Sequence, residues 1–391
     1  MKIALLTTDN REPHKKYALT EPYFGTAPQA LLQGFASLPE VEVHVIACIR
    51  QPVQSPEKIA PNIFFHSLVV PQIGWMRTLY QGCIRATREK LREIQPDIVH
   101  GQGTELDSGI SGALSGFPSV LTIHGNMKAI AEIYQARFAS FHWLAAKLET
   151  VALKKTAGVF CNSAYTESLV APRAKKTWRV PNALQSDFFE PLPPPQKKGV
   201  PVILNIGVME PRKQQLELLA LAERWQQRGL KFELQFIGNR AAHTEYGKRF
   251  SAALAVAEKA GYARHLGLLD TLQLIAAMDS AAALLHFPTE ESFGLVVAEA
   301  LARNLKLFAA ATGGVVEIAS GVAGVELFPA TNFAALETAV AGWLHEGYPA
   351  PRNTPQIMRA RYHPTVVAQQ HLEIYREILR STERRNSKTK K

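Results

Sequence analysis

The stretch from Ala281 to Gly314 constrains the fold more than any other part of this sequence. It opens with an unbroken apolar run, Ala283 to Phe287, closed by Pro288, and such a run predicts a strand that is buried on both faces. A polar turn follows, and from Phe293 apolar residues recur at helical spacing until Asn304. A second buried strand and a Gly-Gly turn come next. This order of elements predicts a parallel sheet with helices packed against it.

The two loops of this unit are where chemistry is expected. In parallel α/β sheets, ligands bind at the carboxyl ends of the strands, where helix N-termini present backbone N–H groups. This rule selects residues 291–294 and the turn Gly313-Gly314. Glu299 is unusual, because it is a carboxylate within the otherwise apolar run Val296 to Leu301. A buried carboxylate is costly unless it is paired, so we expect Glu299 to face a ligand hydroxyl; an exposed helix glutamate is the alternative.

The rest of the chain repeats this alternation and predicts two α/β domains. Residues 191–200 include three consecutive prolines and predict a stiff linker. We therefore expect one domain over residues 1–190, a second over 201–363 and a basic, disordered tail over 381–391. The expected strands cover 2–7, 41–47, 97–100, 118–124, 159–162, 202–206, 232–237, 265–267, 283–287 and 305–310, and the expected helices cover 30–38, 75–94, 129–155, 216–228, 241–260, 271–278, 332–345 and 366–379.

Composition and cysteine usage exclude several classes of protein. A chain of 391 residues with 47% hydrophobic content can form two domains with sizeable cores. No apolar run approaches the roughly 20 residues of a membrane span, and the N-terminus turns polar too early for a secretory signal, so we expect a cytoplasmic protein. The strand at 2–7 is not followed by G-x-G-x-x-G, which argues against a nicotinamide enzyme. Cys48, Cys83 and Cys161 are odd in number, far apart in the sequence and in apolar settings, which predicts buried, reduced thiols and argues against a disulfide framework or a zinc site.

The formal net charge of +10 is unevenly distributed along the chain. Residues 380–391 contain six basic residues and one acidic residue, so they carry half of it. We interpret this tail as a solvated end, with a membrane-surface or nucleic-acid contact as the alternative. A second basic cluster lies on the expected helix 75–94, and its alternatives are a solvated face and docking on anionic lipid head groups. Its members are Arg77, Arg85, Arg88, Lys90 and Arg92.

The residues Glu291-Ser292-Phe293-Gly294-Leu295, with Glu299 eight positions after Glu291, resemble the E-x7-E signature of retaining glycosyltransferases of the GT-B fold, family 4. The family usually reads E-G-F-G-L here, so Ser292 is a departure. Asp97-Ile98-Val99-His100, Val180-Pro181-Asn182 and Gly238-Asn239 extend the resemblance over most of the chain. It implies two Rossmann-like, doubly wound parallel-sheet domains that face each other across a cleft. The first would bind the acceptor and the second the nucleotide-sugar donor, with a C-terminal helix over residues 364–380 that returns to the first domain and makes the cleft a hinge.

The resemblance also assigns roles to individual residues. Lys213 matches the family lysine that holds the donor pyrophosphate, whereas Val208 replaces the family arginine, so Arg212 is the candidate substitute; a solvated cation is the alternative for each. His124 matches the histidine near the transferred sugar, with a structural role as the alternative. Gly25 stands where the family has a Gly-Gly turn near the donor phosphates, with a helix-start residue as the alternative. The implied donor-binding and catalytic set is Gly25, His124, Arg212, Lys213, Glu291, Phe293, Gly294, Leu295, Glu299, Gly313 and Gly314.

The resemblance implies retaining transfer of a hexose from a nucleotide sugar to a glycan or lipid-linked acceptor, in the synthesis of a cell-surface polysaccharide or glycolipid. Glu291 would accept hydrogen bonds from sugar hydroxyls, and Glu299 would hold the ribose hydroxyls. The departing phosphate gains negative charge, which fixed cations and helix N-termini stabilise without a metal, and no Asp-x-Asp motif occurs.

Two other functions remain open for the same fold. One is a nucleotide-sugar epimerase, and the other is a non-catalytic nucleotide-sugar-binding or scaffold protein. No cofactor and no nucleic-acid partner is expected for the transferase. A peripheral position on the inner face of the membrane is the alternative to a free cytoplasmic one.

Overall fold

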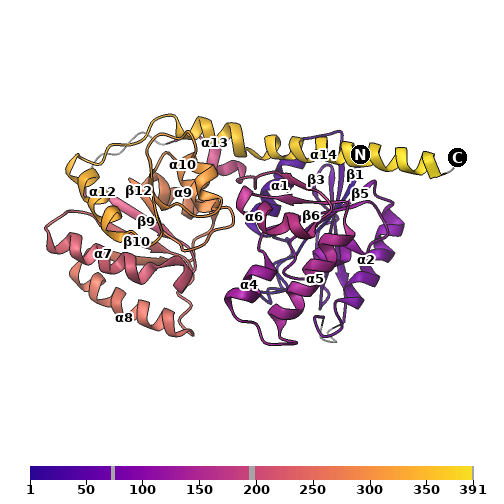
Figure 1. The fold of residues 1–391 in the computed structure, drawn as a ribbon, viewed down its shortest axis with the longest axis horizontal. Coiled ribbons are helices and arrows are strands. Elements are labelled where there is room, and N and C mark those ends of the chain that lie inside the picture. Colours follow the sequence, from indigo (N-terminus) through magenta and orange to yellow (C-terminus); the bar gives the residue numbers. More distant parts are fainter. Residues whose placement is uncertain (72–74, 193–198, 390–391) are drawn as a thin grey trace. The chain divides into compact units, whose positions relative to one another are not determined.

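The computed structural model describes residues 1–71, 75–192 and 199–389, and only the backbone of residues 382–389. The chain forms two compact units (Figure 1). Unit 1 comprises Met1–Gln185 and Tyr362–Lys391, and unit 2 comprises Ser186–Arg361. The first unit therefore ends at Gln185, whereas the sequence predicted a boundary at residue 190. Residues 193–198, in the middle of the predicted linker, lie outside the described residues.

The 3-10 helix η2 (Ser186–Phe189) accounts for this earlier boundary. Arg303 donates from Nη1 to the carbonyl of Glu190 at 2.7 Å, and Arg359 donates to the carbonyl of Phe189. Both arginines belong to unit 2. These two guanidinium groups hold the segment to unit 2, because each of the hydrogen bonds has a charged donor.

Unit 1 is built on an eight-stranded sheet with the order β3-β4-β2-β1-β5-β6-β7-β8. All neighbouring strands are parallel except β3 and β4, which pair antiparallel. Helices cover both faces of the sheet (Figure 1). The elements are β1 Lys2–Leu6, α1 Thr26–Ala36, β2 Glu42–Ile49, β3 Lys58–Ala60, β4 Ile63–Val69, α2 Gln81–Ile94, β5 Ile98–Gln102, α3 Ser108–Ala113, β6 Ser119–Ile123, α4 Met127–Ile133, α5 Phe141–Lys155, β7 Gly158–Cys161, α6 Ala164–Val170, the 3-10 helix η1 Ala171–Arg173, β8 Thr177–Arg179 and α14 Pro364–Thr389.

Helix α14 completes the core of unit 1 although it is the last element of the chain. Leu372 and Tyr375 are buried in the same cluster as Phe35 of α1 and Ile3 of β1. The helix backbones approach closely at Gly34, where a Cβ atom would lie 2.2 Å from the carbonyl oxygen of Pro364. Glycine is therefore required at this contact for steric reasons.

Unit 2 is built on a six-stranded parallel sheet with the order β11-β10-β9-β12-β13-β14. It has its own core, in which Trp225, Phe236 and Phe308 are buried. The remaining elements are β9 Val202–Ile206, the 3-10 helix η3 Pro211–Lys213, α7 Gln215–Gln227, β10 Glu233–Ile237, α8 Glu245–Ala260, β11 Ala263–Gly267, α9 Thr271–Asp279, β12 Ala283–His286, α10 Leu295–Ala302, β13 Lys306–Ala310, α11 Val315–Ala319, β14 Val325–Phe328, α12 Phe333–His345 and α13 Thr354–Tyr362.

Two helix predictions were wrong in their extent. The helix expected from residue 75 begins at Gln81, because Leu79 and Tyr80 adopt left-handed φ angles of 51° and 59°. Arg77 therefore lies before α2, apart from the other members of the basic cluster. The helix expected over 129–155 is two helices, α4 and α5, and the connection contains Gln135 and Ala139 with φ angles of 46° and 61°. A left-handed residue cannot continue a right-handed helix.

The C-terminal helix extends further than its apolar periodicity predicts. The periodic pattern ends at Leu379, whereas α14 continues to Thr389 and includes most of the segment expected to be a disordered tail. Residues 380–389 contain no glycine or proline that would end a helix. Within the part of the chain that the structure describes, no helix is both long and apolar enough to cross a bilayer.

Candidate functional site

Three loops of unit 2 meet at one edge of its sheet. Strands β9, β12 and β13 are parallel neighbours, so their carboxyl ends lie side by side. Strand β9 continues into the loop that contains η3, β12 continues into residues 287–294, and β13 continues into the Gly313-Gly314 turn. Gln214 links the first two loops, because its side-chain amide donates to the carbonyl of Phe287 at 2.7 Å. These loops carry all the predicted donor-site residues of unit 2 except Leu295 and Glu299, which lie in the helix α10.

Lys213 and Glu291 form the charged centre of this edge. The ammonium Nζ of Lys213 donates to Oε2 of Glu291 at 2.6 Å, and both side chains are mostly buried. His286 donates from Nε2 to the same oxygen at 3.1 Å. Burial alone would raise the pKa of Glu291, but the hydrogen bond from His286 and the charge of Lys213 outweigh it and hold that pKa well below its usual range. Glu291 is therefore ionised and oriented by two donors, while its other oxygen, Oε1, takes part in neither bond.

His286 was not predicted as a site residue. It is the last residue of β12, only 1% of its side chain is exposed, and burial lowers its pKa. A neutral imidazole that donates from Nε2 fits this environment. The available signal was its position: a polar residue at the carboxyl end of an otherwise apolar strand, directly before the motif loop.

The loop that carries Glu291 and the Gly-Gly turn are in close backbone contact. The N–H of Gly314 donates to the carbonyl of Glu291 at 3.2 Å. A Cβ atom at Gly314 would lie 2.6 Å from the carbonyl oxygen of Phe293, so no larger residue fits without moving the loop. Gly294 caps α10 with a φ of 97°, which favours glycine. The glycines thus allow Phe293, Gly294 and Leu295 to start α10 beside Glu291.

Glu299 lies in α10 and is only 5% exposed. Desolvation raises the pKa of its carboxyl to about 7. The prediction of a carboxylate on the packed side of this helix is confirmed, and its exposed alternative is wrong. A buried carboxyl with this pKa gains ionisation readily when a ligand supplies hydroxyl donors.

Arg212 uses its charge within its own loop. Its guanidinium forms ion pairs with Glu210 at 2.6 Å and with Glu290 at 3.6 Å, and it donates to the carbonyl of Glu290 at 2.9 Å. Val208 is 48% exposed, so the position of the missing family arginine faces solvent. A donor contact by Arg212 would require it to exchange these acidic partners for phosphate oxygens.

His124 belongs to unit 1, where it joins a chain of hydrogen bonds. It follows β6, and its Nε2 donates to Oε1 of Gln102 at 2.9 Å. The Gln102 amide in turn contacts His100, whose Nδ1 bonds to the hydroxyl of Tyr375 in α14. Burial lowers the pKa of His124 to about 4, so the imidazole is neutral at physiological pH. Gln102, which orients His124, was also not predicted as a site residue.

Gly25 precedes α1 in unit 1 and has an ordinary φ of −59°. A Cβ atom at this position would meet only Pro28, at 3.7 Å. Neither the backbone conformation nor local packing therefore requires glycine here. Either role considered for Gly25, the helix start or the close approach of a phosphate, fits this open geometry.

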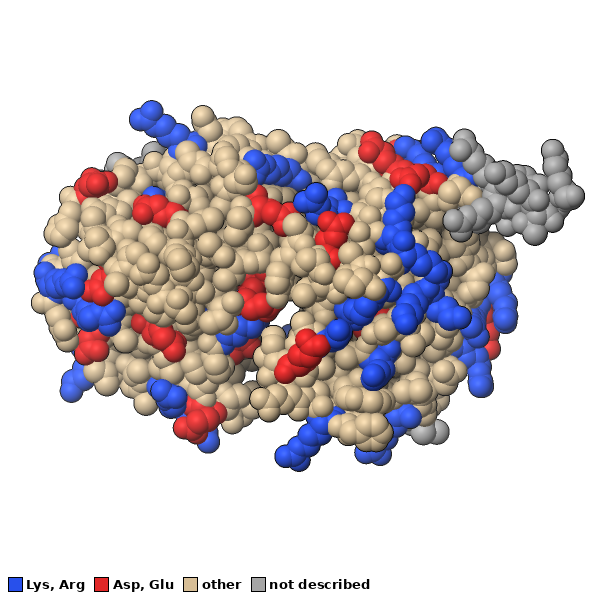
Figure 2. All heavy atoms as spheres, in the orientation of Figure 1, with Lys and Arg blue, Asp and Glu red and all other residues tan. Residues whose placement is uncertain are grey.

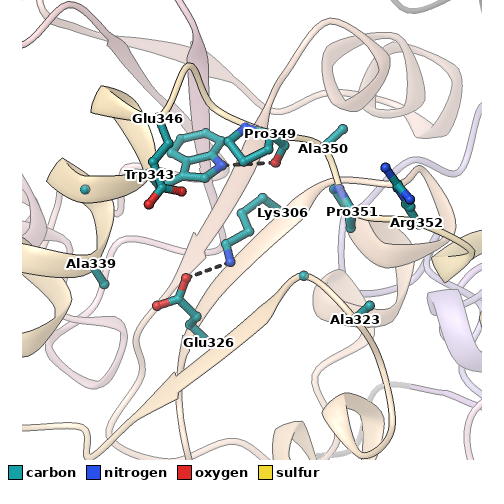
Figure 3. A pocket seen from close by; sticks show the side chains of 12 residues that line it. Lys306, Ala323, Glu326, Ala339, Trp343, Glu346, Pro349, Ala350, Pro351 and Arg352 are labelled. Atoms are coloured by element: carbon teal, nitrogen blue, oxygen red, sulfur yellow. Dashed lines mark hydrogen bonds and ion pairs between the residues drawn. The ribbon is translucent and has the colours of Figure 1, made fainter.

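A cavity of about 510 Å³ lies elsewhere in unit 2 (Figure 3). Lys306, the first residue of β13, contacts Glu326 at 2.7 Å, and Trp343 donates to the carbonyl of Pro349 at 3.1 Å. Because Lys306 begins its strand, this cavity lies at the amino end of β13, away from the loops that hold Lys213 and Glu291. It therefore does not belong to the candidate donor site.

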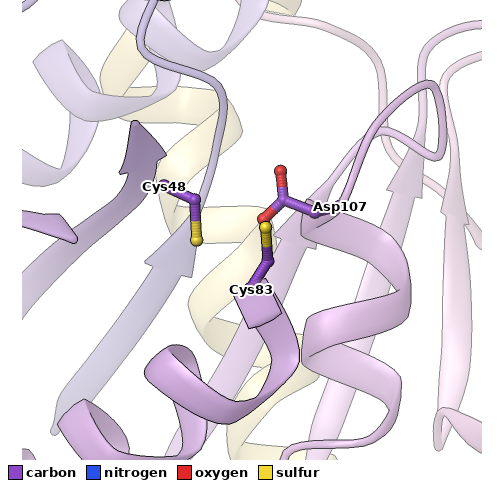
Figure 4. Close-up of side chains that lie close together, drawn as sticks. All are labelled: Cys48, Cys83 and Asp107. Carbon is purple, nitrogen blue, oxygen red and sulfur yellow. The ribbon is translucent and has the colours of Figure 1, made fainter. Parts of the chain in front are cut away.

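One group of side chains in the described residues has the composition of a metal site. The ligand atoms of Cys48, Cys83 and Asp107 all lie within 4.8 Å of one another in unit 1 (Figure 4). The prediction of buried, reduced cysteines is confirmed, because all three are free and buried. The argument against a zinc site relied on their separation in sequence, and the fold removes that separation for two of them.

Comparison with known proteins identifies relatives for both units. Residues 29–187 match the family described as Glycosyltransferase Family 4, and residues 189–361 match Glycosyl transferases group 1. No curated protein sequence matches the chain closely enough to indicate a relative.

Solved structures of low sequence identity share the fold. The sucrose-phosphate synthase of Thermosynechococcus elongatus is 18% identical with a TM-score of 0.77, and the alignment covers 97% of this chain and 100% of that one. Anabaena HepE, solved with UDP and glucose, is 16% identical with a TM-score of 0.70 and coverage of 96% and 100%. The lipopolysaccharide outer core galactosyltransferase WaaB is 15% identical with a TM-score of 0.67 and the same coverage as HepE. The two parallel-sheet units and these similarities establish a GT-B fold.

Proposed function

Since the chain belongs to the group 1 glycosyltransferases of the family 4 type, we propose that it transfers a hexose from a nucleotide sugar with retention and without a metal. The observation that carries this proposal is the contact between Lys213 and Glu291 at the carboxyl edge of the unit 2 sheet. The loop after β9 thus supplies a fixed cation, Lys213, which a departing diphosphate needs. The loop after β12 supplies an ionised hydrogen-bond acceptor, Glu291, which the hydroxyls of a sugar need.

Each group has a distinct task in this proposal. Lys213 stabilises the charge that develops on the leaving phosphate, and the N-terminus of α10 adds backbone N–H groups. Glu291 accepts hydrogen bonds from sugar hydroxyls, held in orientation by His286. Glu299 accepts hydrogen bonds from the ribose hydroxyls, and its carboxyl loses its proton when the donor binds. His124, neutral and oriented by Gln102, lines the acceptor side with an imidazole that can exchange hydrogen bonds with a sugar hydroxyl.

Retention and metal independence rest on the residues that the chain offers. No Asp-x-Asp motif occurs in the sequence, while Lys213 provides positive charge beside the proposed donor site. Glu291 is already paired with Lys213 and His286, which makes it a poor covalent nucleophile. Departure and attack on the same face of the sugar, with the donor phosphate taking the acceptor proton, need no further carboxylate.

A lipid-linked acceptor at a membrane surface is supported by the connection between α4 and α5. Large apolar side chains are exposed to solvent there, and Phe138 is 82% exposed. Exposed basic residues lie in the connection and along α5, and Figure 2 shows many basic side chains on the visible face of unit 1. Apolar side chains framed by cations match an anionic lipid surface. The apolar residues are Ile133, Tyr134, Phe138 and Phe141, and the basic ones are Arg137, Lys147, Lys154 and Lys155.

The first test is thermal unfolding of the purified protein with UDP-, GDP-, ADP- and dTDP-sugars. A ligand at 100 times its dissociation constant stabilises the fold by about 2.7 kcal/mol. UDP-glucose is the first donor to try, because HepE has been solved with it. We expect one nucleotide sugar to stabilise the wild type and not to stabilise the Glu299→Ala variant. Stabilisation by none of them would overturn the donor-site assignment.

The two remaining alternatives are separated by the products. An epimerase releases free sugar from the donor without any acceptor, whereas a transferase releases it only at a low hydrolytic rate. A non-catalytic binding protein shows donor-induced stabilisation and no release of nucleotide. Chromatography of the reaction mixture, with and without a glycan or lipid acceptor, distinguishes these outcomes from glycosyl transfer.

A further inference from the structure

Three potential metal ligands converge from three separate elements of unit 1. Cys48 is near the end of β2, Cys83 lies in the first turn of α2, and Asp107 directly precedes α3. Their sulfur and oxygen atoms all lie within 4.8 Å of one another, and all three residues are buried. Figure 4 shows the three side chains pointing toward a common point between the elements.

Asp107 is the unusual member of this cluster. It occupies the N-cap position of α3, yet its side chain makes no capping hydrogen bond and instead faces the two thiols. Its carboxyl accepts a hydrogen bond from the thiol of Cys48 and one from its own backbone N–H. Among residues 1–71, 75–192 and 199–381, no basic side chain forms an ion pair with it. A buried carboxylate is costly without a counter-charge, and the neighbouring groups are thiols that lose their protons to metals.

We propose that Cys48, Cys83 and Asp107 bind one thiophilic divalent cation of the zinc class. Tetrahedral zinc holds sulfur at about 2.3 Å, so two sulfurs on one ion lie about 3.8 Å apart. A spread of at most 4.8 Å needs only side-chain rotation to reach that geometry. Binding releases the two thiol protons. Cys48 and Asp107 are 6% and 8% exposed, so water can fill the fourth position.

The ion would have a structural effect on unit 1. It connects β2, α2 and the start of α3, which are otherwise joined only by packing and hydrogen bonds. None of the three ligands is a residue to which the proposed transfer assigns a task, and Lys213 and Glu291 belong to unit 2, so the ion is given no step in that transfer. A metal bound here is compatible with metal-independent chemistry, and failure of either proposal leaves the other intact.

Cobalt titration of the full-length protein tests the site directly. Co²⁺ replaces zinc at such sites and reports thiolate ligands through a charge-transfer band in the near ultraviolet and strong visible d–d bands. The titration is done with a phosphine reductant, so that Cys48 and Cys83 cannot form a disulfide. We expect both sets of bands to saturate at one equivalent and to disappear when zinc is added. Absence of the charge-transfer band would overturn the proposal.

The third cysteine provides a matched control. Cys161 is also free and fully buried, but it lies in β7 outside the cluster. We expect Cys83→Ser to weaken cobalt binding by more than about tenfold and to lose charge-transfer intensity. Asp107→Asn should keep the thiolate charge-transfer band but bind cobalt more weakly, and Cys161→Ser should bind cobalt as the wild type does. Equal losses in Cys83→Ser and Cys161→Ser would contradict the assignment.

An experiment on the wild type avoids the risk that a variant fails to fold. Alkylation of the three cysteines is followed by mass spectrometry in the presence and absence of Zn²⁺. The metal should slow the modification of Cys48 and Cys83 by more than about tenfold and leave the rate at Cys161 nearly unchanged. Equal protection of all three would mean general stabilisation of unit 1 and would argue against a site at the cluster.

Discussion

Lys213 and Arg212 are neighbours in the sequence whose charges have different partners. Lys213 contacts Glu291, whereas Arg212 is paired with Glu210 and Glu290 within its own loop. We expect Lys213→Ala to lower kcat by about 100-fold, because a fixed charge beside the leaving group is lost. Arg212→Ala should lower it by less than about tenfold, since its charge is largely neutralised by its partners. Initial rates of nucleotide release measure both effects.

A reversed order of these two effects would change the assignment. If Arg212→Ala is the more damaging substitution, Arg212 replaces the family arginine that Val208 lacks, and it must leave Glu210 and Glu290 when the donor binds. The double variant Glu210→Gln, Glu290→Gln is a suitable control, since it frees Arg212 without removing it. Under our assignment this variant changes the donor KM little.

The Glu299 carboxyl makes stability depend on pH. Its pKa is raised from an ordinary value of 4.5 to about 7 in the folded protein, so the folded state binds more protons than the unfolded state between these values. Stability is therefore lost as the pH rises from 4.5 to 7, by about 3 kcal/mol. Glu299→Gln should raise the free energy of unfolding above pH 7 and leave it nearly unchanged near pH 4.5. Urea unfolding at pH 5 and pH 8 measures the difference.

The same substitution is expected to weaken donor binding. An ionised carboxylate accepts two hydroxyl donors, whereas the glutamine amide offers one oxygen and adds N–H groups that compete. Calorimetric titration with the donor should show affinity that increases with pH up to about 7 in the wild type and is independent of pH in Glu299→Gln. A variant that is more stable and binds equally well would show that Glu299 does not contact the donor.

Several site residues could be predicted because their chemistry is local in sequence. Glu291, Gly294, Glu299 and the Gly-Gly turn lie within one strand-helix-strand unit, so their mutual distances follow from the fold of that unit. His286 was missed although it lies in the same unit, directly before the loop of Glu291, and Gln102 was missed because it orients a residue that follows another strand. The spacing along the chain contains no information on such partners until the sheet order is known.

At the scale of elements, the connection between α4 and α5 provides a test of membrane contact. Phe138→Ser should reduce binding to vesicles that contain anionic lipid by about tenfold, which corresponds to about 1.4 kcal/mol. This is part of the roughly 1.5 to 3 kcal/mol that full burial of such a side chain contributes. Co-sedimentation with vesicles of mixed neutral and anionic lipid measures the bound fraction. Higher salt should weaken binding as well, because Arg137 and Lys147 are exposed.

A matched exposed residue on unit 2 controls for general hydrophobicity. Leu268 is 75% exposed, similar to Phe138 at 82%, but it follows β11 in the other unit. Leu268→Ser should leave vesicle binding unchanged. Equal effects of the two substitutions, or binding that persists at neutral vesicles and high salt, would argue against this segment as the contact.

The elements themselves were predicted well where apolar periodicity was strong. Strand β9 was predicted with its observed bounds, and α7 within one residue at each end. The break between α4 and α5 was missed, since Gln135 and Ala139 are not residues that signal a left-handed conformation. Strands β3 and β4 lie in a proline-containing segment, between residues 47 and 75, for which no strand was predicted. There the edge of the sheet, rather than local preference, determines the conformation.

At the scale of the whole molecule, the contacts between distant segments were beyond the sequence. Nothing in a single sequence indicates that Cys83 meets Cys48 or that Tyr375 reaches His100. The local pattern of apolar residues predicts which side chains are buried. Contacts between residues distant in sequence depend instead on which helix covers which strand. The return of the C-terminal helix to unit 1 was inferred only through the resemblance to a known family.

The joining of the chain's two ends in unit 1 can be tested at Gly34, with Gly342 as the control. Replacement of a helical glycine by alanine normally stabilises a protein by up to about 1 kcal/mol. At Gly342 in α12, a Cβ atom meets nothing within 4 Å, so Gly342→Ala should follow this rule. At Gly34, the Cβ atom would lie 2.2 Å from the carbonyl oxygen of Pro364, so Gly34→Ala should instead destabilise the protein by about 1 to 3 kcal/mol.

Hydrogen exchange locates the effect of Gly34→Ala within the molecule. Amides of α1 and α14 should exchange faster, because the displaced α14 exposes its contact with the core of unit 1. Amides of unit 2, which has a separate core, should be unchanged, and the donor should still protect the loops that hold Lys213 and Glu291. If donor protection were lost together with α14 packing, the last helix would control the donor site as well as unit 1, and the two units would have to be treated as one cooperative structure.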